Sequence, residues 1–145
     1  MLLLAGLLVA GCAGQPGTGT GPSASPDPRG SHQVAATITY ERQGGIAGFN
    51  DRLVVQPDGS YTFTGRYRSS GTGMLSAAEL TELGRLLESA DFTTAPTYSP
   101  LRIADGFNHI IRYRDREVRV GDGNIPAGLR PVVDLFGGIL RRHGA

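Results

Sequence analysis

Cys12 is the side chain of this sequence best placed to react, because it ends the segment Val9-Ala10-Gly11-Cys12 after an apolar run that begins at Leu2. Small residues before such a cysteine are typical of a bacterial lipoprotein signal, in which the thiol takes up a diacylglycerol group. The pattern therefore predicts residues 1–11 as a signal peptide and Cys12 as the lipidated first residue. The acyl chains would hold the protein on the extracytoplasmic side of the cell membrane.

The apolar segment departs from a usual signal in one respect. A signal peptide normally opens with positive charge, yet the first charged residue of this sequence is Asp27. We therefore expect translation to start upstream of Met1. The apolar run is also too short for a membrane-spanning helix, which needs about 20 residues. The alternative to lipidation is a secretory signal that contains Cys12 by chance.

The other candidates for catalysis form no recognisable constellation. The three histidines, His32, His109 and His143, show no metal-ligand spacing. Ser60 and the pair Ser69-Ser70 fall in predicted turns without an acidic and a histidine partner, so no serine triad is indicated. The sequence thus predicts no metal site, no cofactor and no enzymatic activity. His109 is interpreted as a hydrogen-bonded core histidine, because it alternates with apolar neighbours.

The segment Gly121-Asp122-Gly123-Asn124 resembles the start of a calcium- or phosphate-binding loop. It lacks the later ligands of an EF-hand and the lysine of a phosphate loop. The favoured interpretation is a turn in which Asn124 caps the helix that follows.

Four arginines cluster in residues 112–119, with Asp115 and Glu117 between them. We interpret them as a solvated face of a sheet, and attraction to anionic lipid head groups is the alternative. A formal net charge of +1 and the lack of interleaved aromatic residues exclude nucleic acid as the expected partner. The four are Arg112, Arg114, Arg116 and Arg119.

A glycine-rich segment is the best candidate for binding another protein. Its small residues allow the backbone to approach another surface closely, and its two large apolar side chains, Ile46 and Phe49, could serve as anchors. The alternative is a loop that folds one of these side chains back onto the sheet. The segment consists of Gly44, Gly45, Ile46, Ala47, Gly48 and Phe49.

The domain that must position these residues spans 34–143. Residues 12–33 are rich in Gly, Ser, Thr and Pro, so they cannot bury enough apolar surface to offset ordering and are predicted to be a flexible tether. Residues 34–143 have the length of one domain with a single core.

Hydrophobic periodicity predicts an α+β fold, with an antiparallel sheet of about five strands and two helices packed on one face. Pro57-Asp58-Gly59 is a hairpin turn, and Ser76 with Glu79 forms a capping box at a helix start. Pro131 is expected in the first turn of the last helix. The predicted elements are strands 34–40, 53–56, 60–68, 107–113 and 117–120, a helix from Ser76 to Ala90, and a C-terminal helix that carries Leu129 to Leu140.

Taken together, these segments resemble the emfourin family of small proteins that inhibit thermolysin-like zinc metalloproteases. The resemblance covers nearly the whole domain, in order, and departs from the family at the hairpin around Pro57-Asp58-Gly59 and in the lipoprotein signal. The matching segments are Tyr40–Arg42, Gly44–Gly48, Leu75–Leu80, Leu86–Phe92, Asp105 with Phe107, Ile125–Pro126 and Leu129–Leu135.

The resemblance implies an inhibitor of a secreted thermolysin-like metalloprotease, and the lipoprotein signal predicts that this inhibitor is anchored to the membrane. It does not identify the inhibitory residues, and our own candidate is the glycine-rich segment with Ile46 or Phe49 as its anchor. The alternative function is that of a non-enzymatic envelope lipoprotein which binds another protein or a ligand without inhibiting it. An enzyme is the least favoured class.

Overall fold

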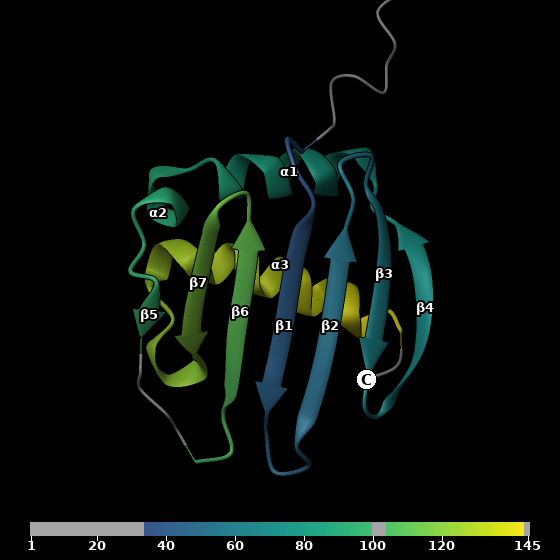
Figure 1. The fold of residues 1–145 in the computed structure, drawn as a ribbon, viewed down its shortest axis with the longest axis vertical. Coiled ribbons are helices and arrows are strands. Elements are labelled where there is room, and N and C mark those ends of the chain that lie inside the picture. The colour runs from purple at the N-terminus through teal and green to yellow at the C-terminus, as the bar shows by residue number, and fades with distance from the viewer. Residues whose placement is uncertain (1–33, 100–103, 144–145) are drawn as a thin grey trace, which may run out of the picture.

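The strand β1 (Ile38–Gly44) lies in the middle of one sheet (Figure 1). It pairs antiparallel with β2 (Phe49–Val55) on one side and with β6 (Phe107–Tyr113) on the other. The computed structural model describes residues 34–99 and 104–143, and the elements are drawn from these. The further elements are β3 (Ser60–Gly65), β4 (Arg68–Met74), α1 (Ala77–Leu87), α2 (Ala90–Thr93), β5 (Tyr98–Ser99), β7 (Arg116–Gly121), the 3₁₀ turns Asp122–Asn124 and Ala127–Leu129, and α3 (Arg130–Arg141).

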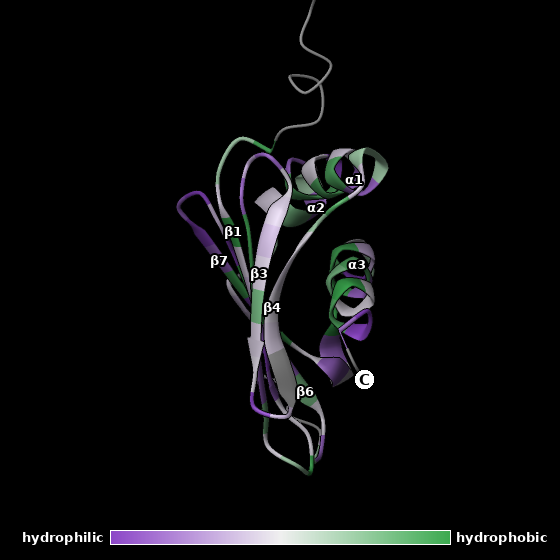
Figure 2. Ribbon diagram, turned by 90° about the vertical axis from the view of Figure 1, so that its right-hand side faces the viewer, coloured by the Kyte–Doolittle hydropathy of each residue, from purple (hydrophilic) through white to green (hydrophobic). Residues whose placement is uncertain are grey.

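The strands are ordered β4-β3-β2-β1-β6-β7-β5, and the helices lie on one face of the sheet (Figure 2). The strands from β4 to β7 in this order pair antiparallel with one another. The two-residue β5 pairs with β7 in parallel at the edge of the sheet. The predicted α+β class is confirmed. The sheet has more strands than the predicted five, and α2 adds a third, four-residue helix.

The first strand lies further along the chain than predicted. β1 runs from Ile38 to Gly44 rather than from Val34 to Tyr40, and β2 begins at Phe49 rather than at Leu53, so both strands reach closer to the glycine-rich turn than predicted. The prediction was wrong here because Arg42 and Gly44 interrupt the apolar pattern of the inner face. This end of the sheet extends past α3 in Figure 2, so it does not need apolar side chains to fill a core.

The predicted strand 60–68 is in fact two strands, because the chain turns at Arg66 and Tyr67 and returns as β4. The glycines of β4 make room for the aromatic rings of β3. A Cβ at Gly71 would lie 2.8 Å from the Phe63 ring, and one at Gly73 would meet the Tyr61 hydroxyl. Gly71 and Gly73 are therefore required by packing, although glycine is otherwise depleted in strands.

The helices follow their predicted signals closely. The Ser76–Glu79 capping box is present in α1, although the helix ends at Leu87 because Ser89 caps the separate α2. Pro131 lies in the first turn of α3 as expected. Asn124 does not cap α3: it lies in a 3₁₀ turn, and α3 begins six residues later.

Among the described residues no helix is long and apolar enough to cross a membrane.

Candidate functional site

The glycine-rich segment forms the tip of the β1–β2 hairpin (Figure 1). Gly44 and Phe49 are the last paired residues of the two strands, and Gly45–Gly48 make the turn. Gly45 and Gly48 have φ angles of 71° and 64°, which glycine adopts without strain, and the Gly48 N–H donates to the Gly45 carbonyl at 3.0 Å. The Ile46 side chain is left 87% exposed at the apex.

The two predicted anchors have different environments. Phe49 folds back onto the sheet, where its ring packs edge-on against Tyr67 at 5.3 Å and Phe107 at 5.8 Å. The turn is also held by the Gly45 N–H, which donates to the Gly106 carbonyl at 3.2 Å. The hairpin tip, Gly45–Gly48, is thus braced by its neighbours and presents Ile46 to a partner.

A buried ion pair lies on the inner face of the same hairpin. Arg42 donates from Nε and Nη2 to one carboxylate oxygen of Asp51, at 3.1 and 2.6 Å, and Asp51 is 0% exposed. The Arg42 guanidinium also lies 4.6 Å from the centre of the Phe107 ring. Sequence reasoning missed this pair, because the two residues belong to a hairpin that was not recognised.

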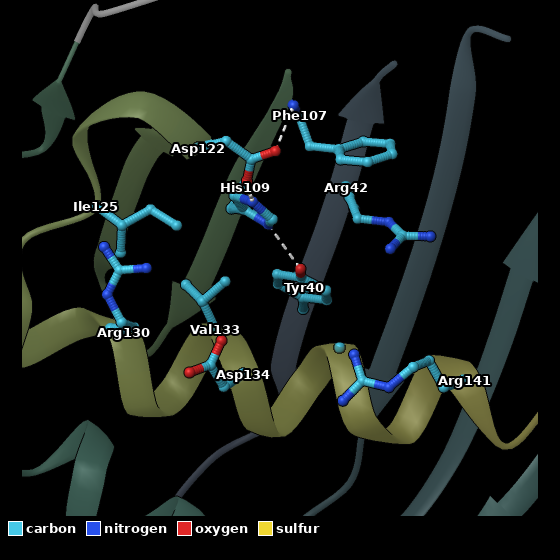
Figure 3. Close-up of a pocket in the computed structure, with 11 residues that line it drawn as sticks. Tyr40, Arg42, Phe107, His109, Asp122, Ile125, Arg130, Val133, Asp134 and Arg141 are labelled. Carbon is cyan, nitrogen blue, oxygen red and sulfur yellow. Dashed lines mark hydrogen bonds and ion pairs between the residues drawn. The ribbon is translucent and has the colours of Figure 1, made fainter. Parts of the chain in front are cut away.

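A hydrogen-bonded chain of three side chains runs beside this ion pair (Figure 3). His109 Nε2 is 2.6 Å from Asp122, and Asp122 also accepts from the Phe107 N–H at 2.9 Å. An ionised carboxylate only accepts, so His109 Nε2 carries a proton, and in the neutral imidazole Nδ1 then accepts from the Tyr40 hydroxyl at 2.7 Å. His109 is buried and hydrogen-bonded, which confirms its interpretation as a core histidine.

The chain resembles a proton relay in its sequence of groups, but the hydroxyl at its end belongs to a buried side chain. Tyr40 is 1% exposed and stacks on Phe136 of α3 at 4.6 Å. Burial raises the pKa of Tyr40 far above its ordinary value, so the phenol stays protonated. The arrangement therefore orients side chains between the sheet and α3 rather than activating a nucleophile.

A solvent-open cavity of about 330 Å³ lies between this chain and α3 (Figure 3). The sheet contributes Tyr40, Arg42, Phe107 and His109 to its wall, and the 3₁₀ turn contributes Asp122. Among the residues that line it, α3 supplies Arg130, Val133, Asp134, Gly137 and Arg141. Sequence analysis noted Asp122 only as part of a turn and did not single out the polar residues of α3.

The remaining sequence candidates lie elsewhere. Arg112 bridges Glu41 at 2.8 Å and Glu117 at 2.5 Å, and Arg119 also pairs with Glu117, so these two arginines lie on one neutralised sheet face. The other two arginines of the cluster contact different elements: Arg114 pairs with Glu88, and Arg116 donates to the Ala95 carbonyl. Ser60 begins β3, and Ser69-Ser70 lie within β4 rather than in a turn. Cys12 and His32 lie outside the described residues.

The parts of the chain that the structure describes hold no group of three or more His, Cys, Asp or Glu side chains that could bind a metal ion. No protein-family model matches the sequence, and a search of curated proteins finds no match either. The hairpin tip and the cavity are the two candidate functional sites among the described residues.

The contacts of Asp122 predict a pH-dependent stability. Burial raises the pKa of Asp122, but the hydrogen bonds from His109 and the Phe107 N–H outweigh it and hold this pKa below its usual value. The stabilisation is complete above the unfolded-state pKa and is lost as pH falls through the native one. Urea denaturation should show Asp122→Asn less stable than the parent by about 1 kcal/mol at pH 7, with a smaller difference near pH 3. Parallel pH profiles for the two proteins would contradict this role.

Proposed function

We propose that this chain is a lipid-anchored extracytoplasmic protein, without enzymatic activity of its own, that inhibits a secreted thermolysin-like zinc metalloprotease. The observation that carries the proposal is the hairpin tip, on which a single large apolar side chain, Ile46, is 87% exposed. The resemblance of the sequence to the emfourin family supports the choice of target.

The inhibitor would enter the protease cleft with a preformed loop. Such a loop needs an apolar side chain for the hydrophobic primed-side pocket and a main-chain or carboxylate oxygen near the zinc. Ile46 provides the first, and the turn carbonyls beside it are candidates for the second. The bracing of the tip by Phe49 and Gly106 favours tight binding, because little conformational entropy remains to be lost on association.

Replacing Ile46 by aspartate should weaken inhibition by about thirtyfold or more, since the loss of a central apolar anchor costs about 2 kcal/mol or more. The measurement titrates the purified protein against a panel of thermolysin-like enzymes and compares inhibition constants. Met74→Asp is the matched control, because Met74 is also an exposed apolar side chain but lies on β4, away from the tip.

Two results would count against the proposal. If the parent inhibits none of the enzymes at micromolar concentration, the chain is better described as a non-enzymatic envelope binding module. If Met74→Asp loses as much inhibition as Ile46→Asp, the tip is not the inhibitory element.

The lipid anchor on Cys12 has its own test. Cys12→Ala removes the thioether site, so the folded domain should leave the membrane fraction whenever its signal is cleaved. A high-salt wash should leave the parent protein on the membrane, because salt screens electrostatic attachment through the arginines of residues 112–119 but not acyl insertion. Release of the parent by salt alone would contradict lipidation.

A further inference from the structure

The polar face of α3 toward the cavity has a regular charge pattern. Arg130, Asp134, Gly137 and Arg141 follow one another at helical spacing, four, three and four residues apart, and all line the cavity. Figure 3 shows Arg130 toward one end, Arg141 toward the other and Asp134 between them. The helix thus presents positive, negative and positive charge in series.

These three charges differ from the others around the cavity. Arg42 is neutralised by Asp51, and Asp122 already accepts from His109 and from the backbone. Arg130, Asp134 and Arg141, by contrast, form no ion pair with any residue that the structure describes. The charged groups that α3 presents to the cavity are therefore two cations around one anion.

Gly137 permits the position of Arg141. A Cβ at Gly137 would lie 3.3 Å from Arg141 Nη1, so the guanidinium lies back along the helix and over the glycine. Glycine inside a helix costs about 1 kcal/mol relative to alanine, and the space it leaves is used by this side chain. The guanidinium of Arg141 then lies about 10 Å along the axis from residue 130, with Asp134 between them.

We propose that this cavity binds an amino dicarboxylate, such as free L-glutamate. The two carboxylates of the ligand would bind Arg130 and Arg141, and its ammonium would bind Asp134. The methylene chain would lie against Ile125 and Val133, which also line the cavity. The ligand reproduces the charge series of α3 with opposite signs, so each of its charged groups meets one of opposite sign on the helix. The proposal is independent of the protease inhibitor function.

Calorimetric titration of the purified full-length protein with L-glutamate tests it. We expect a dissociation constant of about 1 mM or tighter. Glutarate lacks the ammonium and L-glutamine lacks the second carboxylate, so each should bind about tenfold more weakly. Absence of glutamate binding, or equal affinity for all three compounds, would overturn the proposal in favour of an empty surface or a general anion patch.

Single substitutions test each of the three proposed ligand contacts separately. Arg130→Gln and Arg141→Gln should each weaken glutamate about tenfold, and one of them should abolish the preference for glutamate over glutamine. Asp134→Asn should weaken glutamate but strengthen glutarate, because it removes repulsion from the dianion. Arg85→Gln is the control, since Arg85 pairs with Glu82 on α1 and should leave binding unchanged. Equal behaviour of Asp134→Asn and the parent toward both ligands would overturn the assignment of the ammonium site.

Discussion

Arg42→Leu is expected to lower the free energy of unfolding by about 3–5 kcal/mol, because it leaves a buried carboxylate without its charged partner. Asp51 is 0% exposed and receives two hydrogen bonds from the Arg42 guanidinium. These two hydrogen bonds replace part of the solvation that the Asp51 carboxylate has in the unfolded state, so its negative charge becomes costly when Arg42 is removed. Urea denaturation at pH 7, followed by circular dichroism, measures the change.

The double variant Arg42→Leu/Asp51→Leu distinguishes the cost of an orphaned charge from the loss of packing. Replacing both members of a buried ion pair by apolar side chains is often nearly neutral. The double variant should therefore recover most of the stability that Arg42→Leu loses. A double variant that is less stable than Arg42→Leu would mean that the shape of the pair, and not its charge, holds this end of the hairpin.

Phe136→Ala should also cost about 3–5 kcal/mol, since it removes a fully buried ring from the centre of α3. Phe136 is 0% exposed and stacks on Tyr40 at 4.6 Å, so its loss leaves a cavity beneath the sheet. Thermal and urea denaturation give the change in stability. Leu135→Ala is the neighbouring control: Leu135 packs only partly against the core, so a loss well below that of Phe136→Ala is expected. Equal losses of unfolding free energy at the two positions would show that the Phe136 ring is not a central contact of the core.

Local signals predicted the helices well, because they act within a few residues. The Ser76–Glu79 capping box and Pro131 each place a helix start through contacts inside one turn. Pro57-Asp58-Gly59 likewise identified the β2–β3 hairpin, since Gly59 adopts a φ angle of 87° in that turn. The sequence also shows in which order strand-like segments, with a two-residue period, and helix-like segments follow one another. This order was sufficient to predict the α+β class.

Contacts across the sheet could not be predicted in the same way. β4 has a composition that indicates a loop, and its glycines are explained only by the rings of Phe63 and Tyr61 on the neighbouring strand. For the candidate site, the sequence identified the hairpin tip and a buried His109. It did not identify Asp122 as the partner of His109, because the register of β6 and β7 brings residue 121 beside residue 108 and so places Asp122 there.

The position of Val34 has a consequence for where the protein can act. Val34 packs near Gly84 of α1, and β1 runs from that end of the molecule to the hairpin tip at the other (Figure 1). β1 spans about 23 Å between these two ends. The chain that precedes Val34 therefore joins the domain at the end opposite Ile46, so under the proposed anchor on Cys12 the hairpin tip would point away from the attachment point.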